Sequence, residues 1–386
     1  MKKKIAMILA ICLLISGGVS APVQAETLVE SGKSAILIEV ETGQIMYELN
    51  PHEQLEPASM TKMMPMYLIL EAIQDGRMTW DKEVTTSAHA ASMGGTQIYL
   101  EPGEIMTVRD LFKSVAISSA NDSVTALGEA LSGTEEAFVE LMNARAKEFG
   151  MTNTVFKNPT GLPAEGHVTT AYDMAVLAKR LILDFPEVTE FTAMHEDYVR
   201  EDSEEPFWLV NTNKLVRYVE GVDGLKTGST DAAGYCLAAT AKRGDMRVVA
   251  VVMGAQRSEL RNREIARLIE HAFAQYELHP KIPTGQTVGI HHNILVAGRQ
   301  FETVTTGPIN LLLPAGTVVG EEHYDIILHD DIQIPIEPGD IIGQLIYYID
   351  GEIYTQIDLT VSETVPRTSF LSLWMHTLGR LLFGSH

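Results

Sequence analysis

The chain has almost no cysteine. Only Cys12 and Cys236 occur among its 386 residues, and Cys12 lies in an N-terminal segment that we expect to be removed. A single remaining thiol excludes an internal disulfide, so the fold must depend on its hydrophobic core. At about 360 residues the mature chain is long enough to build such a core, and this length suggests two or three domains.

Basic residues are also scarce, because 29 Lys and Arg stand against 51 Asp and Glu, for a formal net charge of −22. Without the three lysines of the N-terminal segment, 26 basic residues remain against 51 acidic ones, which gives a net charge of −25. A surface this acidic repels other polyanions, which argues against nucleic acid as a partner.

The chain lacks an apolar run that would span a membrane comfortably. The longest candidate, residues 5–15, follows three lysines and precedes small residues that end at Ala25. That order is typical of a signal peptide, and the short run disfavours a retained anchor helix. We therefore expect residues 1–25 to be removed during secretion across the cytoplasmic membrane, leaving the protein peripheral on the outer face of the cell membrane.

Strand-like and helix-like segments alternate over residues 26–277. Strands at both ends of this region, with helices between them, predict one sheet packed against helices, an α+β or mixed α/β domain. A hairpin is predicted over 34–49 around Thr42-Gly43. Helical periodicity covers 58–73, 108–131, 136–148, 170–183 and 262–276, and buried strands are predicted over 235–241 and 246–253.

The pattern changes after residue 277. Residues 279–285 have the Pro and Gly content of a linker, and short alternating runs follow. One pair of runs is joined by Asp350-Gly351, which predicts a hairpin. Residues 278–365 are therefore interpreted as a small all-β domain.

The final segment, residues 366–386, contains no acidic residue but carries Arg367 and Arg380. Residues 368–383 would form a helix of about 24 Å that is basic and amphipathic, which predicts that it lies on the surface of an anionic membrane. Docking onto the β domain is the competing interpretation. The apolar residues that share one helical face are Phe370, Leu373, Trp374, Leu378 and Leu381.

Ser59-Met-Thr-Lys62 carries the most chemical information. It begins the helix predicted over 58–73, and a spacing of three places Ser59 and Lys62 on one helical face. A serine hydroxyl is a weak nucleophile that needs a base, and a lysine whose pKa is lowered by burial can serve. Alone the pattern is weak, because a capping serine followed by a solvated lysine is common.

Two further short motifs follow. Ser119-Ala-Asn121 lies between two helical stretches, where its hydroxyl and amide can face one cleft, although both residue types also favour ordinary turns. Lys226-Thr227-Gly228 precedes a predicted strand pair. A lysine, a hydroxyl and a glycine on a strand edge can bind a carboxylate while the backbone passes close to the ligand.

Taken in order, the three motifs resemble the signature of penicillin-binding proteins and serine β-lactamases. Longer stretches resemble one branch, the low-molecular-mass D-alanyl-D-alanine carboxypeptidases, from about Val29 to the end of the chain. The resemblance implies a penicillin-binding/β-lactamase-like transpeptidase domain of α+β class, a small all-β domain and a C-terminal amphipathic helix. The stretches that carry it are Pro57–Lys62, Ala116–Asp122, Asn158–Leu162, Thr170–Ala175, Asn211–Lys214, Val222–Gly228 and Ala233–Cys236.

The same resemblance implies catalytic roles for individual residues. Ser59 matches the serine that becomes acylated, and Lys62 matches its general base. Ser119 matches the serine that relays a proton toward the leaving D-alanine, and Asn121 matches the amide that holds the substrate backbone.

The remaining matches concern substrate binding. Lys226 and Thr227 match the residues that bind the terminal carboxylate, beside Gly228. Arg261 is aligned with an arginine that organises this carboxylate site. The backbone amides of Ser59 and Ser229 are expected to form the oxyanion hole.

Two positions depart from the family pattern. Pro65 lies six residues after Ser59 and predicts a kink in the helix that carries the nucleophile. Thr160 stands where some relatives have histidine, which leaves the role of that position open. Elsewhere, His291-His292 lacks partners at ligand spacing, so neither a metal site nor a cofactor is expected.

The implied reaction removes the terminal D-alanine from peptidoglycan pentapeptides through an acyl-enzyme. β-Lactam antibiotics resemble that terminus and are expected to acylate Ser59. A β-lactamase is a competing hypothesis, with Glu165 as a candidate deacylating residue, and fast turnover of penicillin would indicate it. The resemblance is also compatible with an inactive wall-binding or sensor module, and with an endopeptidase that acts on cross-links.

Overall fold

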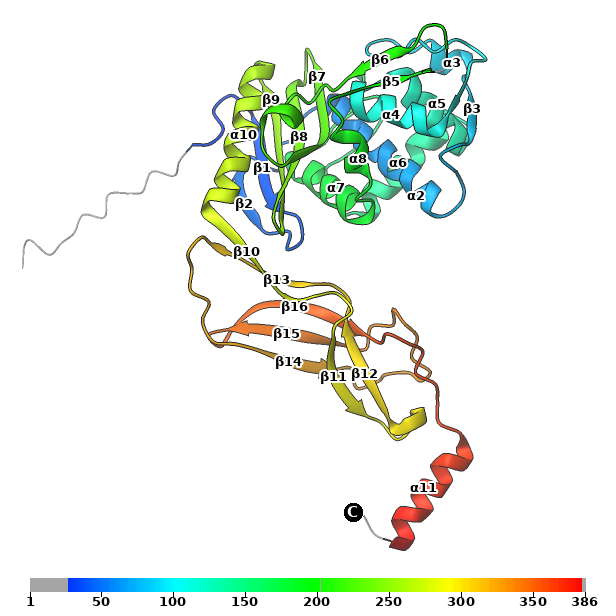
Figure 1. Ribbon diagram of the computed structural model, residues 1–386, viewed down its shortest axis with the longest axis vertical. Coiled ribbons are helices and arrows are strands. Elements are labelled where there is room, and N and C mark those ends of the chain that lie inside the picture. Colours follow the sequence, from blue (N-terminus) through cyan, green and yellow to red (C-terminus); the bar gives the residue numbers. More distant parts are fainter. Residues whose placement is uncertain (1–26, 202, 384–386) are drawn as a thin grey trace, which may run out of the picture.

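The computed structural model describes residues 27–201 and 203–383. Two bodies follow one another along the long axis of the molecule, and a separate helix lies at the far end (Figure 1). The first body combines one sheet with many helices, whereas the second is built from strands. This is the α+β domain followed by an all-β domain that the sequence predicts. The expected signal peptide, residues 1–25, lies outside the described residues.

A five-stranded sheet organises the first body, in the order β2-β1-β9-β8-β7 with every neighbouring pair antiparallel. The predicted hairpin over 34–49 is confirmed as β1 and β2. β7, which contains the Lys-Thr-Gly motif, is an edge strand of this sheet. The bounds are β1 Ser34–Glu39, β2 Ile45–Leu49, β7 Val222–Thr230, β8 Gly234–Arg243 and β9 Met246–Ala255.

Both faces of the central strands are buried, because successive side chains point to opposite sides of a strand. Val248, Ala250 and Val252 of β9 pack with Leu268 of helix α10, which runs from Ser258 to Gln275. The alternate residues of β9 belong to the cluster that includes the helices on the other face. Strands buried on both sides explain the continuous apolar runs in the sequence.

In the helical layer beyond the second face, a threonine cap begins each of the helices α4 Val108–Ser118, α6 Glu135–Glu148 and α7 Ala171–Asp184. Thr107, Thr134 and Thr170 accept a hydrogen bond from the backbone amide three residues later, which satisfies one free donor at each helix start. The other helices of this layer are α2 Met63–Gln74, α3 Ala88–Ala91, α5 Asn121–Ser132 and α8 Val188–Thr192. The short helix α9 Leu215–Tyr218 packs instead with the cluster that contains α10. Two small hairpins, β3 Glu83–Thr85 with β4 Ile105–Thr107 and β5 Glu196–Val199 with β6 Phe207–Val210, complete this body.

The helix that carries the nucleophile is divided rather than kinked at its proline. A 3-10 segment, η1 Ala58–Lys62, precedes α2, which begins only at Met63. Pro65 therefore falls in the first turn of α2, where backbone amides have no partner within the helix. The missing N–H costs nothing at that position, so the expected kink is replaced by a change of helix type three residues earlier.

The second body contains a five-stranded sheet in the order β11-β12-β16-β15-β14 and a two-stranded sheet of β10 and β13. The predicted linker over 279–285 is wrong in part, because β10 Tyr276–Ile282 pairs with β13 Ile309–Pro314. Pro280 is tolerated because a strand with one open edge needs no amide donor on that side. The other elements are β11 Thr287–His292, η2 Ala297–Arg299, β12 Gln300–Thr305, β14 Glu322–Leu328, β15 Gly343–Ile349 and β16 Glu352–Thr360.

The C-terminal helix α11, Phe370–Phe383, extends away from the β domain (Figure 1). Phe370 is 83% exposed and Trp374 is 51% exposed, and Leu371 and Met375 beside them are exposed as well. Among the described residues, no helix combines the length and the apolar character needed to cross a bilayer.

The N-terminal segment of the first body is held by one carboxylate. Glu264 of α10 is buried and accepts hydrogen bonds from the backbone amides of Glu30 (2.9 Å), Ser31 (2.5 Å) and Gly32 (3.1 Å). Glu264→Ala would leave these amides unpaired, and we expect the free energy of unfolding to fall by about 3 kcal/mol. Urea denaturation followed by circular dichroism measures the change.

Glu270→Ala is the matched control on the same helix. Glu270 forms an exposed ion pair with Arg243, and pairs of this kind contribute less than about 1 kcal/mol. Equal losses in the two variants would contradict the structural role given to Glu264.

Candidate active site

Ser59 and Lys62 lie at the start of the helical layer, on η1. The Nζ atom of Lys62 is 3.0 Å from the Oγ atom of Ser59. Lys62 is fully buried, whereas Ser59 is half-buried. A spacing of three residues thus brings the two groups into hydrogen-bonding distance, as the sequence predicts.

Two further oxygen atoms surround the Lys62 amine. Nζ donates to Oδ1 of Asn121 at 2.6 Å and to the backbone carbonyl of Thr160 at 2.5 Å. Both oxygens can only accept hydrogen bonds. If the Lys62 amine is neutral, its two N–H groups therefore donate to these two oxygens. The lone pair of Nζ is then left facing the hydroxyl of Ser59, which is the arrangement that a general base requires.

The electrostatic surroundings favour that neutral form. Burial lowers the pKa of Lys62 well below its ordinary value, and the positive charge of Lys226 lowers it further. The carboxylate of Asp122 acts in the opposite direction on the pKa of Lys62. Desolvation dominates, because a charged amine without water is costly.

The second motif lies in the turn between α4 and α5. Ser119 ends α4 in the left-handed conformation (φ 67°), and its buried Oγ has no hydrogen-bond partner within the part of the chain that the structure describes. Asn121 begins α5, and its Nδ2 donates to the carbonyl of Gly94 at 2.7 Å, which turns Oδ1 toward Lys62. The turn therefore offers one free hydroxyl and one oriented amide.

The third motif reaches the nucleophile through the backbone of β7. A Cβ atom added at Gly228 would lie 3.0 Å from the amide nitrogen of Ser59 and 2.8 Å from the carbonyl oxygen of Pro57. Only glycine allows this approach, which explains why the motif ends in that residue. The strand edge and η1 thus form the two sides of one site, next to Ser229.

Lys226 and Thr227 precede that glycine. Lys226 is buried, and burial together with the nearby charge of Arg261 lowers its pKa to about 7. Thr227 donates a hydrogen bond from Oγ1 to Oγ1 of Thr212 at 2.7 Å. The two residues provide a cation and a hydroxyl on the same edge.

Arg261 lies behind this edge on α10. Its guanidinium donates to the carbonyl of Cys236 at 3.2 Å and to the side chain of Asn262. Its effect on Lys226 is therefore electrostatic. The oxyanion hole predicted between the amides of Ser59 and Ser229 stays a prediction, although the contact at Gly228 brings the two segments together.

Sequence reasoning missed the carbonyl of Thr160, although it singled out the surrounding Asn158–Leu162 stretch. The turn is built by Asn158, whose Oδ1 accepts from the amide of Gly161 at 2.7 Å. Gly161 has φ +78°, and a Cβ there would lie 1.9 Å from the carbonyl oxygen of Ala58. Gly161 could have indicated a tight turn, but the sequence does not show which backbone carbonyl will accept a hydrogen bond.

Asp122 and His167 were also missed as parts of the site. The buried carboxylate of Asp122 accepts from the amides of Ile98 and Leu100, which fixes the segment beside Asn121. His167 lies 3.0 Å, through Nε2, from Oγ1 of Thr61 on η1. Glu165, the candidate deacylating residue of a β-lactamase, is exposed to solvent.

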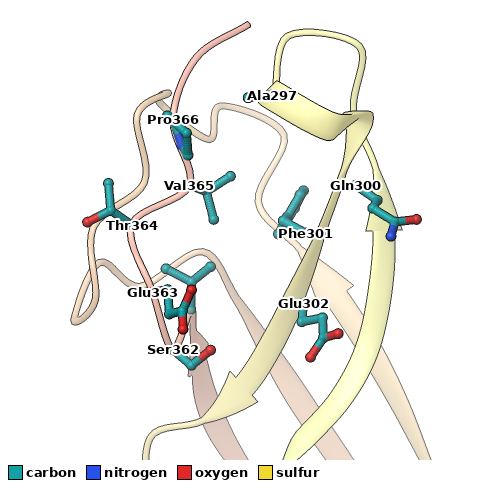
Figure 2. A pocket seen from close by; sticks show the side chains of 10 residues that line it. Ala297, Gln300, Phe301, Glu302, Ser362, Glu363, Thr364, Val365 and Pro366 are labelled. Carbon is teal, nitrogen blue, oxygen red and sulfur yellow. The ribbon is translucent and has the colours of Figure 1, made fainter.

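A separate hollow of about 380 Å³ lies in the β domain, between β12 and the chain after β16 (Figure 2). Phe301 and Val365 contribute its apolar wall, and Glu302 and Glu363 are its charged residues. It contains none of the predicted site residues. Among the described residues, no group of three or more His, Cys, Asp or Glu side chains is arranged to hold a metal ion.

Comparison with known proteins identifies relatives of this arrangement. A family model described as D-alanyl-D-alanine carboxypeptidase matches residues 21–257. D-alanyl-D-alanine carboxypeptidase DacF of Bacillus subtilis is 46% identical over 355 residues, which is 91% of this chain and 90% of that protein.

Solved structures show the same similarity. Penicillin binding protein 5 from Haemophilus influenzae superimposes with a TM-score of 0.74 at 28% identity, covering 87% of this chain and 98% of that one. Penicillin-Binding Protein D2 from Listeria monocytogenes, in its ampicillin-bound form, has a TM-score of 0.54 at 34% identity, covering 63% of this chain and 98% of that one.

The lowered pKa of Lys226 leads to a test of the cation in the site. If protonated Lys226 attracts an anionic ligand, acylation by penicillin should slow as the pH rises through about 7, where the empty site loses this charge. Lys226→Arg keeps its charge throughout this range, because guanidinium has a pKa above about 12. The arginine variant should acylate more slowly but show no decline above pH 7. Second-order acylation rates against pH measure both effects, and an equal decline in the two proteins would refute the assignment.

Proposed function

The chain belongs to the D-alanyl-D-alanine carboxypeptidase family and is a serine-type carboxypeptidase, and we propose that Ser59, Lys62 and Ser119 perform its chemistry. One observation carries this proposal. The amine of Lys62 is 3.0 Å from the Ser59 hydroxyl, with its two N–H groups used by Asn121 and Thr160.

In the first step, the Ser59 oxygen attacks the carbonyl carbon of the penultimate D-alanine while Lys62 accepts the hydroxyl proton. The lowered pKa of Lys62 supports this role, because burial favours the neutral amine, which is the form that can accept a proton. Negative charge develops on the carbonyl oxygen, where the amides of Ser59 and Ser229 are proposed to donate. Removal of one such donor typically costs about 10²–10³ in rate.

The peptide bond then breaks, and its nitrogen needs a proton before D-alanine can leave. The unpartnered Oγ of Ser119 supports a role in passing this proton from Lys62. Water subsequently attacks the ester on Ser59, with Lys62 again accepting a proton, which releases the shortened peptide. Every step uses groups of the chain, the substrate and water.

Recognition of the substrate end is proposed for the edge of β7. The terminal carboxylate of a peptide carries a full negative charge, and Lys226 and Thr227 offer a cation and a hydroxyl beside Gly228. Arg261 strengthens the positive potential from behind the strand. Asn121 would hold the substrate backbone on the opposite side of the cleft.

The substrate class is the peptidoglycan stem peptide that ends in D-Ala-D-Ala, and β-lactams are its covalent analogues. The ampicillin-bound form of the Listeria monocytogenes relative supports binding of β-lactams at such a site. A β-lactamase is not favoured, because the relatives are carboxypeptidases and Glu165 is exposed.

Intact mass after treatment with penicillin tests the nucleophile. The parent protein should gain the mass of one drug molecule, and Ser59→Ala should gain none, because the attacking oxygen is missing. The parent should also release D-alanine from a pentapeptide. Labelling that persists in Ser59→Ala would refute the assignment of Ser59. Rapid loss of the label from the parent protein, with release of the hydrolysed drug, would indicate a β-lactamase.

We also propose that the mature protein works outside the cytoplasm, after removal of residues 1–25, and attaches to the outer face of the cell membrane through α11. The exposed side chains of Phe370, Leu371, Trp374 and Met375 support this, because apolar groups left in water are stabilised in the boundary between lipid headgroups and chains. The absence of acidic residues after Glu363 removes repulsion from anionic lipids.

Sedimentation with vesicles tests this attachment. Phe370→Asp combined with Trp374→Asp should weaken binding to vesicles that contain anionic lipid by more than about tenfold, because burial of each aromatic side chain contributes roughly 1.5–3 kcal/mol. Hydrolysis of a soluble peptide should not change. Ile353→Asp is the control, since Ile353 is an exposed apolar residue of the β domain. Equal vesicle binding by the double variant and its parent would refute the role of α11.

A further inference from the structure

The loop of residues 158–168, between α6 and α7, is attached to the nucleophile's helix at two neighbouring positions. Near its start, the carbonyl of Thr160 accepts from Nζ of Lys62. Near its end, Nε2 of His167 lies 3.0 Å from Oγ1 of Thr61. The partners Thr61 and Lys62 are adjacent residues of η1. The histidine is therefore placed to control how the loop meets the catalytic amine.

His167 is held rigidly. It is 3% exposed, and its ring meets Phe156 edge to face at 5.9 Å between centroids. Its neighbour Val168 pairs through the backbone with Val155. The imidazole thus connects the segment that pairs with Val155 to the hydroxyl of Thr61, within a closely packed interior.

The protonation state of the ring follows from its surroundings. Burial, with a smaller contribution from the positive charge of Lys157, lowers the pKa of His167 to about 4. Nδ1 is buried and has no hydrogen-bond partner within the described part of the chain. The neutral tautomer with its proton on Nε2 avoids burying an unpaired N–H at Nδ1, so Nε2 donates to Thr61.

We propose that His167 is a positioning residue, whose hydrogen bond to Thr61 keeps the Thr160 carbonyl on the Lys62 amine. This inference rests on the proposed roles of Ser59 and Lys62. With the carbonyl in place, the amine has one rotational state that directs its lone pair at Ser59. Without it, the amine can turn, and the base no longer faces the hydroxyl.

Losing the hydrogen bond between His167 and Thr61 should have two effects on acylation: a shift in its pH dependence and a lower maximal rate. A carbonyl acceptor stabilises the ammonium form more than the neutral amine, so its loss lowers the pKa of Lys62 still further. The charged groups acting on Lys62 are Lys226 from β7 and Asp122 from α5, and neither changes. The rising limb of acylation, where Lys62 loses its proton, should therefore move to lower pH while the plateau rate falls.

The experiment compares acylation of the full chain by penicillin across pH. His167→Ala and Thr61→Val remove the contact from opposite sides, and each should lower the plateau rate by about tenfold. Each should also move the rising limb to lower pH. The double variant should be no slower than either single variant, because both changes break one interaction. His167→Gln keeps a side-chain N–H donor and should recover most of the rate.

His291→Ala is the matched control. Nε2 of His291 lies 3.1 Å from Oγ1 of Thr303 in the β domain, which is the same type of contact far from the site. Its acylation profile should equal that of the parent. The labelled fraction at saturation corrects every rate for the amount of folded protein.

Three results would overturn the inference: a lower plateau in His167→Ala with an unmoved limb, normal acylation in Thr61→Val, or additive losses in the double variant. The first result would indicate that the rate falls for a reason other than a change in the hydrogen bonding of Lys62. None of these results affects the assignment of Ser59, which is refuted separately if Ser59→Ala is still labelled by penicillin.

Discussion

The site depends on one buried amine, Lys62, whose pKa burial lowers well below its ordinary value. Lys62 has no exposure to water, and its neighbours are a hydroxyl, an amide oxygen and a backbone carbonyl rather than a carboxylate. A carboxylate in contact would restore the charge of the amine and abolish its basicity. The carboxylate of Asp122, which raises the pKa of Lys62, instead accepts hydrogen bonds from backbone amides of the 98–100 segment. The surrounding structure therefore lowers the pKa of Lys62 and holds its amine beside Ser59.

Close backbone approaches make this arrangement possible. Gly228 and Gly161 both press against the start of η1, where a methyl group would overlap the backbone of Pro57 or Ala58. One approach brings the edge of β7 that carries Lys226 and Thr227 to Ser59, and the other brings the Thr160 carbonyl to Lys62. The 3-10 segment itself is compatible with Pro65 because α2 begins after it. Catalytic geometry in this protein is thus set by backbone as much as by side chains.

The distinction between backbone and side-chain contacts also explains which parts of the site could be predicted from the sequence. The short motifs and the continuous apolar runs were accessible from residue types. The runs predicted the central strands, and the motifs contain Ser59, Lys62, Ser119, Asn121, Lys226 and Thr227. The Thr160 carbonyl was not accessible in this way, because any residue supplies a carbonyl and only tertiary contact selects one. His167 was missed because its partner is 106 positions away. The strand β10 was hidden by Pro280, whose local preference suggested a linker although an open edge accommodates it.

The arrangement of the domains gives the proposed attachment a geometric consequence. The catalytic domain and α11 lie at opposite ends of the molecule, with the β domain between them (Figure 1). If α11 lies on a membrane, the cleft is held at a distance from the lipid that the β domain sets. A peripheral enzyme without such a spacer would meet only substrate close to the headgroups. In that proposed arrangement, anionic lipid would repel the strongly acidic body, whereas the chain after Glu363 carries no acidic residue. The acid-free C-terminal segment would then attach the protein to the membrane, and the acidic catalytic and β domains would be kept away from its surface.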